Sequence, residues 1–129
     1  MNIGFLTSEY PHNKTGASGG IGTSIKNLAA ALIKLDNKVT VFIYGQAIDN
    51  EFLDGRVNIV QIRNIKFKGL SWYLTRKKIQ NILNRHITEK GLQIVEAPDW
   101  TGITAFMKLN CPVVIKLHGS DTYFCRLDK

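Results

Sequence analysis

The sequence predicts an α/β fold: a Rossmann-like, mostly parallel sheet with helices on both faces. Short apolar, β-branched segments alternate along the chain with longer amphipathic segments, which is the order typical of strands and crossover helices. The 129 residues are enough for about one domain. A hydrophobic fraction of 44% and a charged fraction of 21% lie near globular averages and argue against a disordered chain.

The first half of the chain predicts a strand, a helix and two further strands. Residues 3–7 are expected to form a short buried strand, followed by a glycine-rich loop over residues 12–20. Apolar residues recur at spacings of three and four over residues 21–35, which places them on one helix face. Residues 39–43 (VTVFI) have the composition of a strand buried on both faces. Residues 57–62 alternate, as in a strand nearer an edge.

The second half predicts helix, strand, helix and strand. A long helix is expected over residues 71–90, capped by its first serine and stopped by Gly91. Residues 92–96 and 112–117 predict the fourth and fifth strands, and residues 101–109 a short third helix. Connections of these lengths imply right-handed crossovers. The link between the second and third strands has only about a dozen residues, so one strand pair there is expected to be antiparallel.

Ligands of such sheets bind outside the carboxyl ends of the strands. Polar residues follow the first, fourth and fifth predicted strands at that edge: Glu9, Glu96, Asp99, His118 and Asp121. A His directly after a buried strand can be held rigidly and can exchange a proton near neutral pH, although a lone His is often structural. Trp100 could provide a stacking wall for a sugar beside the two acids, or the segment could be a turn in which Asp99 caps a helix.

The loop after the first strand is glycine-rich (GASGGIG, residues 16–22). Glycines let backbone N–H groups approach an anion, and the next helix adds its positive N-terminal end, so the loop favours a phosphate or diphosphate. A P-loop is excluded because no Gly-Lys-Ser/Thr follows. A dinucleotide fingerprint fails because Ile25 stands where the third Gly is needed, which disfavours NAD. The alternative is a flexible hinge between strand and helix.

A basic stretch runs from Arg63 to Lys78, with Phe67, Trp72 and Tyr73 interleaved, in a chain of net charge +7. It could lie on an anionic membrane, contact phosphates of an acceptor or of RNA, or be an ordinary solvated face. No apolar run approaches the roughly 18 residues of a membrane span, and no signal peptide is recognisable. With two cysteines and no metal-binding or redox spacing, a cytoplasmic protein is expected.

Several motifs in order resemble the start of the family 4 (group 1) glycosyltransferases. They are SEYP (8–11), GGIG (19–22), NLAAAL (27–32), VTV (39–41), EAPDW (96–100) and VIKLHG (114–119), and the resemblance runs from residue 1 to about 121. It implies the GT-B architecture of two Rossmann-like domains facing across a cleft. The N-terminal domain mainly holds the acceptor, and the C-terminal domain mainly holds the nucleotide sugar.

The resemblance also implies roles for individual residues. Gly19, Gly20 and Gly22 would lend backbone N–H groups to the donor diphosphate, and His118 would be the catalytic-site histidine that orients the donor sugar. Transfer would retain the anomeric configuration, as in a hexosyltransferase, without a metal and with the nucleotide sugar as substrate, not as cofactor. On an acceptor-side domain, the acceptor would be expected at the polar residues of the carboxyl edge: Glu9, Glu96, Asp99, Trp100 and Asp121.

The family's second domain, with its paired glutamates, has no counterpart in the sequence. Residues 1–129 are therefore expected to be a partial N-terminal domain that is inactive alone and needs the missing C-terminal domain. The expected partners are a nucleotide-sugar donor and a saccharide or lipid-linked acceptor, with peripheral contact at the inner face of an anionic membrane, and no nucleic acid. The alternatives are a stand-alone module that binds an anionic ligand or membrane surface, and a split enzyme completed by another polypeptide.

Overall fold

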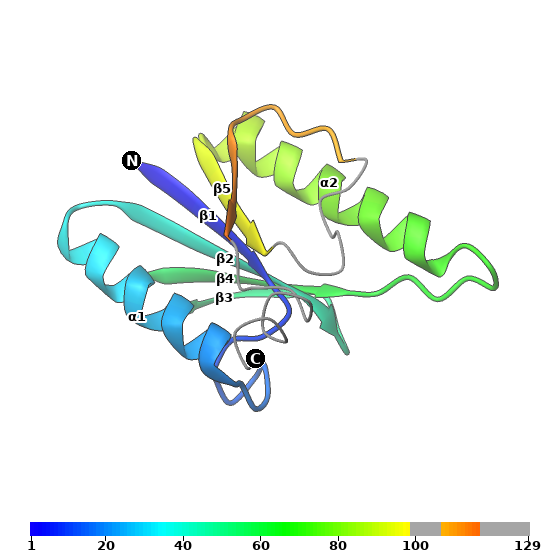
Figure 1. Ribbon diagram of the computed structural model, residues 1–129, viewed down its shortest axis with the longest axis horizontal. Helices are drawn as coiled ribbons and strands as arrows, with labels where there is room; N and C mark the ends of the chain where they lie inside the picture. Colours follow the sequence, from blue (N-terminus) through cyan, green and yellow to red (C-terminus); the bar gives the residue numbers. More distant parts are fainter. Residues whose placement is uncertain (99–106, 117–129) are drawn as a thin grey trace, which may run out of the picture.

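The computed structural model describes residues 1–98 and 107–116. In this part of the chain, six strands form one sheet, which lies between two helices (Figure 1). The elements are β1 (Asn2–Thr7), α1 (Gly20–Lys34), β2 (Lys38–Gln46), β3 (Asn50–Asp54), β4 (Val57–Arg63), α2 (Ser71–Lys90), β5 (Ile94–Pro98) and β6 (Val113–Lys116). The strand order is β3-β4-β2-β1-β5-β6.

All neighbouring strands are parallel except β3 and β4. The predicted fold class is confirmed, and so is the expectation of one antiparallel pair near β4. The prediction missed β3 itself, which fills the short link and returns along the sheet edge, so β2 and β4 are parallel without a crossover helix. The expectation that residues 57–62 form a strand nearer an edge is confirmed, since β4 lies between β2 and the edge strand β3, which leaves β4 mostly buried.

The boundaries of later elements differ in smaller ways. The fourth predicted strand (92–96) begins and ends two residues later, as β5, while Leu92 packs in the core just before it. β6 lies within the fifth predicted strand (112–117). Most of the predicted third helix, residues 101–106, lies outside the described residues, and residues 107–109 are irregular.

Two apolar clusters on opposite sheet faces hold the helices in place. Leu6 and Phe42 pack with Ile79 and Leu83 of α2, while Phe5 and its neighbours pack with α1. Because successive strand side chains point to opposite faces, alternate residues of each strand enter different clusters. This pattern confirms the predicted double-sided sheet. Because β1, β2, β4 and β5 pair in parallel, their carboxyl ends lie at one common edge of the sheet (Figure 1).

The two ends of α2 lie at opposite edges of the sheet, because the helix follows β4 and precedes β5. α2 stops at Gly91, which has the left-handed φ of 71° that glycine tolerates, as predicted. Ser71 does not cap α2 as expected: Leu70 holds the cap position, and the Ser71 hydroxyl bonds to the backbone N and O of Phe67 instead. No helix in the described part of the chain is long and apolar enough to cross a membrane.

Candidate functional site

The site is built on a tight turn directly after β1. The buried Thr7 hydroxyl donates a hydrogen bond to the carbonyl O of Glu9 at 2.9 Å and accepts one from the Glu9 N–H at 3.2 Å. This pair of bonds folds the chain back over two residues and holds the Glu9 backbone. The Glu9 side chain is therefore carried toward the start of α1.

Glu9 closes the glycine-rich loop by bonding to its backbone. Its Oε1 accepts a hydrogen bond from Gly22 N at 2.9 Å, and its Oε2 accepts one from Gly19 N at 3.1 Å. Gly19 is the cap residue of α1 and has no side chain with which to cap it. The carboxylate supplies what the helix end lacks, because free N–H groups and the helix dipole both favour an anion there.

The three predicted loop glycines differ in what surrounds them. A Cβ on Gly22 would clash with Ser18 Oγ and lie 3.1 Å from the backbone O of Glu9. A Cβ on Gly19 would make ordinary contact with the Glu9 carboxylate at 3.5 Å. A Cβ on Gly20 would meet nothing within 4 Å. Packing inside the protein thus explains why residue 22 is a glycine, while the space over Gly20 is open to an external group.

An open hollow of about 540 Å³ lies beside this loop. Ser18 and Lys26 contribute to its wall, together with His12. Lys26 Nζ donates a hydrogen bond to Pro11 O at 3.1 Å and lies 3.6 Å from Asp54 Oδ2, so its ammonium is held close to the loop. The hollow therefore has one cation in its wall, paired with Asp54, beside a loop that leads into the N-terminus of α1.

Glu96 lies one strand away, in the middle of β5 and not after the strand as predicted. It pairs in register with Phe5 of β1 and lines a narrow depression with Thr7, Ser8 and Lys116. The structure thus brings four of the predicted residues together at the start of α1: Glu9, Gly19, Gly20 and Gly22. Glu96 lies nearby on β5, the strand that pairs with β1. The predicted residues Asp99, Trp100, His118 and Asp121 lie outside the described residues.

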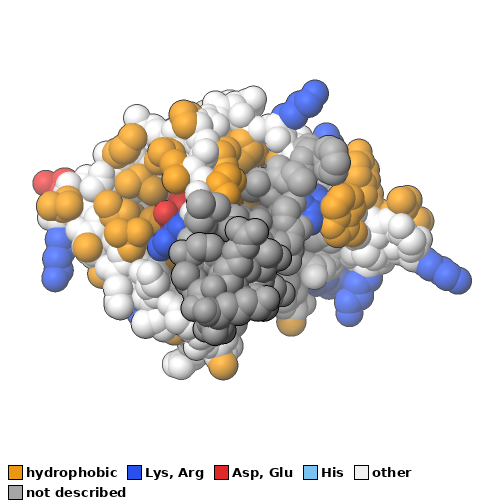
Figure 2. Space-filling view, in the orientation of Figure 1, with side chains coloured by type: hydrophobic (Ala, Val, Ile, Leu, Met, Phe, Trp, Pro, Cys, Tyr) orange, Lys and Arg blue, Asp and Glu red, His pale blue; other side chains and the backbone are white. Residues whose placement is uncertain are grey.

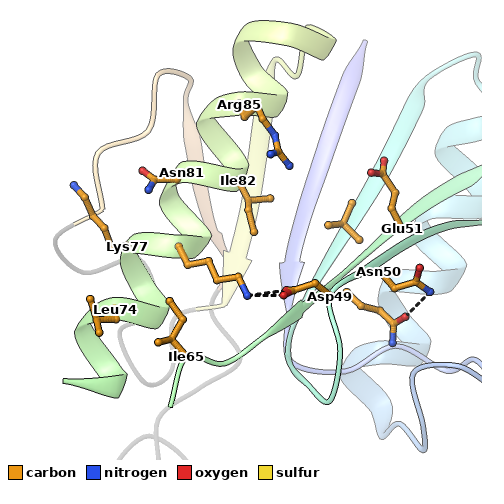
Figure 3. Close-up of a pocket in the computed structure, with 12 residues that line it drawn as sticks. Asp49, Asn50, Glu51, Ile65, Leu74, Lys77, Asn81, Ile82 and Arg85 are labelled. Carbon is orange, nitrogen blue, oxygen red and sulfur yellow. Dashed lines mark hydrogen bonds and ion pairs between the residues drawn. The ribbon is translucent and has the colours of Figure 1, made fainter. Parts of the chain in front are cut away.

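A second hollow, a groove of about 840 Å³, separates α2 from the β3–β4 side of the sheet (Figure 3). Lys78 Nζ bridges it, donating to Asp49 Oδ1 at 2.7 Å, Asp49 Oδ2 at 2.9 Å and the carbonyl O of Arg63 at 2.9 Å. Burial alone would raise the pKa of Asp49, but the bonds from Lys78 and from Arg63 N, with their charges, outweigh it and lower this pKa.

Sequence reasoning missed this groove and the buried Gln61 beside it. Gln61 Nε2 donates to Lys14 O and to Gln46 Oε1, both at 3.0 Å, which ties the glycine-rich loop region to the sheet. A polar Gln within the apolar strand VNIVQI was a usable signal, since buried amides need partners. The bond between Asp49 and Lys78 left no such signal, because these residues are 29 positions apart and each is ordinary in its own segment.

Comparisons with known proteins agree with this geometry. Sucrose-phosphate synthase from Thermosynechococcus elongatus superposes with a TM-score of 0.61 at 15% identity, over 92% of this chain and 33% of that chain. An E. coli structure, described as trehalose-6-phosphate bound with UDP-2-fluoro glucose, has a TM-score of 0.53 at 10% identity, over 98% and 36%. The chain thus spans about a third of these two proteins, which share the GT-B type of Rossmann-like fold.

No curated protein sequence matches the chain significantly. The family model described as Glycosyltransferase Family 4 does match, over residues 18–129. This match covers most of the chain, including α1 with its glycine-rich start, and agrees with the mostly parallel sheet. The chain therefore belongs to glycosyltransferase family 4.

Proposed function

We propose that residues 1–129 are the acceptor-side part of a retaining glycosyltransferase that is inactive without a nucleotide-sugar domain. The complete enzyme would move a sugar, as a hexosyltransferase does, from a nucleotide-sugar donor to a saccharide or lipid-linked acceptor. Family membership and the one-third coverage of two longer GT-B proteins support this proposal. One of those proteins was solved with UDP-2-fluoro glucose, a nucleotide sugar.

The observation that carries the proposal is the pair of loop amides aimed at a single anion. Gly19 N and Gly22 N converge on the Glu9 carboxylate at the N-terminal end of α1. A carboxylate and a phosphate share negative charge and several acceptor oxygens, so this loop end has the donors that a diphosphate needs. In the reaction, these N–H groups would stabilise the negative charge that develops on the departing diphosphate.

Glu9 must then share or yield its position when the donor arrives. The space above Gly20 is open, so a phosphate could approach the helix end there while Glu9 rotates aside. Two anions on one helix end repel each other, which makes donor binding sensitive to the Glu9 charge. Glu9 would afterwards be available to an acceptor hydroxyl, together with Glu96 and the predicted Asp99, Trp100 and Asp121.

His118 completes the proposal by orienting the donor sugar, without attacking it. We expect the reaction to need no metal and no cofactor, and the enzyme to work in the cytoplasm at the inner face of the membrane. Whether the native chain continues into a nucleotide-sugar domain can be tested by measuring the mass of the native product with an antibody to this chain. A product much larger than 14.5 kDa would support the proposal, and one near that mass would favour a split enzyme or a stand-alone binding module.

The catalytic proposal is tested by Gly20→Val in the complete enzyme, assayed with a panel of nucleotide sugars. The valine side chain would project into the open space over the loop and block phosphate without disturbing internal packing. Removing such stabilisation typically lowers turnover by about a hundredfold or more. Ala30→Val, on the exposed side of the same helix, is the matched control. Unchanged kinetics in Gly20→Val would refute the assignment of the loop to the diphosphate.

A further inference from the structure

The most prominent exposed apolar surface of the described chain surrounds the start of α2. Four side chains within seven residues are at least half exposed there: Phe67 (58%), Leu70 (50%), Trp72 (57%) and Tyr73 (55%). Lys66, Lys68 and Lys77 are exposed among them. We call these seven residues the aromatic-basic patch. Figure 2 shows hydrophobic side chains and projecting Lys and Arg side chains gathered at the end of the molecule where this loop lies.

This exposure belongs to an ordered turn. Leu70 N donates to Phe67 O at 3.0 Å, and the Ser71 hydroxyl bridges Phe67 N and O at 2.8 Å each. Gly69 provides the positive φ of 81° that the turn requires. The turn therefore holds Phe67 and Leu70 away from the core, on a loop that projects beyond the body of the domain (Figure 1).

The charge around the patch has one sign. Between Gly55 and Thr88 the sequence has eight Lys and Arg residues and no Asp or Glu. Two of these cations are used internally: Lys78 bonds to Asp49, and the buried Arg76 lies 4.2 Å from the ring centre of Trp72. The three patch lysines make no ion pair or hydrogen bond within the described part of the chain, and Lys77 points away from the strands in Figure 3.

We propose that the aromatic-basic patch docks on the surface of an anionic phospholipid bilayer, with its four apolar side chains among the headgroups. Amphipathic aromatic rings settle at the boundary between headgroups and acyl chains, and lysines reach the lipid phosphates while their stems lie on apolar surface. The patch consists of a protruding turn and the adjoining start of α2, whereas proteins that bind single-stranded nucleic acid track the backbone in a groove. The shape and the apolar content both favour a lipid surface over RNA.

The first test measures binding to vesicles of equal parts phosphatidylcholine and phosphatidylglycerol, with pure phosphatidylcholine as reference, using the full-length protein. The patch triple Lys66→Gln/Lys68→Gln/Lys77→Gln should weaken co-sedimentation roughly a hundredfold, at about fivefold per charge. The matched triple Lys34→Gln/Lys38→Gln/Arg56→Gln removes equal charge at the opposite edge of the sheet and should change binding only a few-fold. Equal losses in both triples would overturn the proposal.

The second test asks whether the apolar side chains enter the bilayer. In a Trp100→Phe background, Trp72 is the one remaining tryptophan, and its emission should shift to the blue on anionic vesicles but not on phosphatidylcholine. Phe67→Ser/Leu70→Ser should weaken vesicle binding about tenfold. Both side chains are exposed, so an unchanged melting temperature confirms the fold. An unshifted Trp72 emission, or charge-dependent binding to single-stranded RNA in place of vesicles, would contradict lipid docking.

Discussion

Gly22 N donates a 2.9 Å hydrogen bond to Glu9 Oε1, and this bond joins the turn after β1 to the first turn of α1. With the bond from Gly19 N to Oε2, it makes Glu9 the cap of a helix whose own cap residue lacks a side chain. The same two N–H groups are those proposed to receive the donor diphosphate. Glu9 thus has two effects that can be separated by experiment: it stabilises the helix start, and it competes with a second anion.

We expect Glu9→Gln to lower the free energy of unfolding by about 1 kcal/mol, because the amide keeps one acceptor and loses the charge. The same change should tighten the binding of a nucleoside diphosphate to the complete enzyme about fivefold, since one repulsion of about 1 kcal/mol is removed. Chemical denaturation and calorimetric titration measure the two effects. Glu89→Gln, an exposed acid on α2, is the control, and weaker diphosphate binding in Glu9→Gln would show that the carboxylate assists the donor.

The steric environment of the loop predicts different outcomes for two neighbouring glycines. Gly22→Ala should destabilise the protein by about 1 to 2 kcal/mol, because the added methyl meets Ser18 Oγ and the backbone O of Glu9. Gly20→Ala adds a methyl in open space within a helix, where alanine is preferred, and should be neutral or slightly stabilising. Thermal melts of both variants make the comparison. Equal melting temperatures would mean that the loop does not close around Gly22 in solution.

The main pattern of the fold was predictable because each central strand carries it locally. Residues 39–43 are apolar on both faces, and the structure buries that stretch between two helices. β3 was not predictable in the same way. Its sequence, NEFLD, is rich in residues that disfavour strands, and it is a strand because β4 offers a free edge with which it pairs.

The sequence indicated where the loop lies, but not what occupies it. The glycine spacing and the helix after it indicated an anion-binding loop, which stays a prediction, and in the structure two of its backbone N–H groups bind the Glu9 carboxylate. The sequence did not indicate that Glu9 fills the loop from ten to thirteen residues away, because the contact depends on the turn at Thr7. Ser71 shows the opposite case: it was a good candidate cap by residue type, but the turn at Phe67 uses its hydroxyl.

A buried tyrosine anchors the segment just before the glycine-rich loop. The Tyr10 hydroxyl donates to Asp54 Oδ2 at 2.9 Å, and burial, followed by this carboxylate, raises the pKa of Tyr10 well above its usual range. Tyr10→Phe should lower the free energy of unfolding by about 1.5 kcal/mol, since a hydrogen bond to a charged group is lost. Tyr73→Phe, at an exposed position, should leave the free energy of unfolding unchanged. Tyrosines in water ionise at about pH 10. An alkaline titration followed by ultraviolet absorbance should find Tyr10 still protonated at that pH.

The bond between Asp49 and Lys78 across the groove predicts a pH dependence of stability. The pKa of folded Asp49 lies below its ordinary value of 3.8, so the folded state favours the charged carboxylate. This stabilisation is present above the ordinary pKa and is lost as the pH falls through the lower, folded pKa. Because Asp49 exposes 56% of its side chain, we expect Asp49→Asn to cost only a few tenths of a kcal/mol at neutral pH.

The difference between Asp49→Asn and the unmodified protein should therefore shrink as the pH is lowered from about 6 toward about 3, because both then lack the charge at this position. Urea denaturation at a series of pH values measures this difference in the free energy of unfolding. Lys78→Met should reduce the same acid-dependent difference by removing the donor, while Asp36→Asn, an exposed carboxylate without an ion pair in the described structure, should follow the unmodified protein. A difference that grows in acid would mean that Asp49 is protonated in the folded state and that Lys78 does not hold it charged.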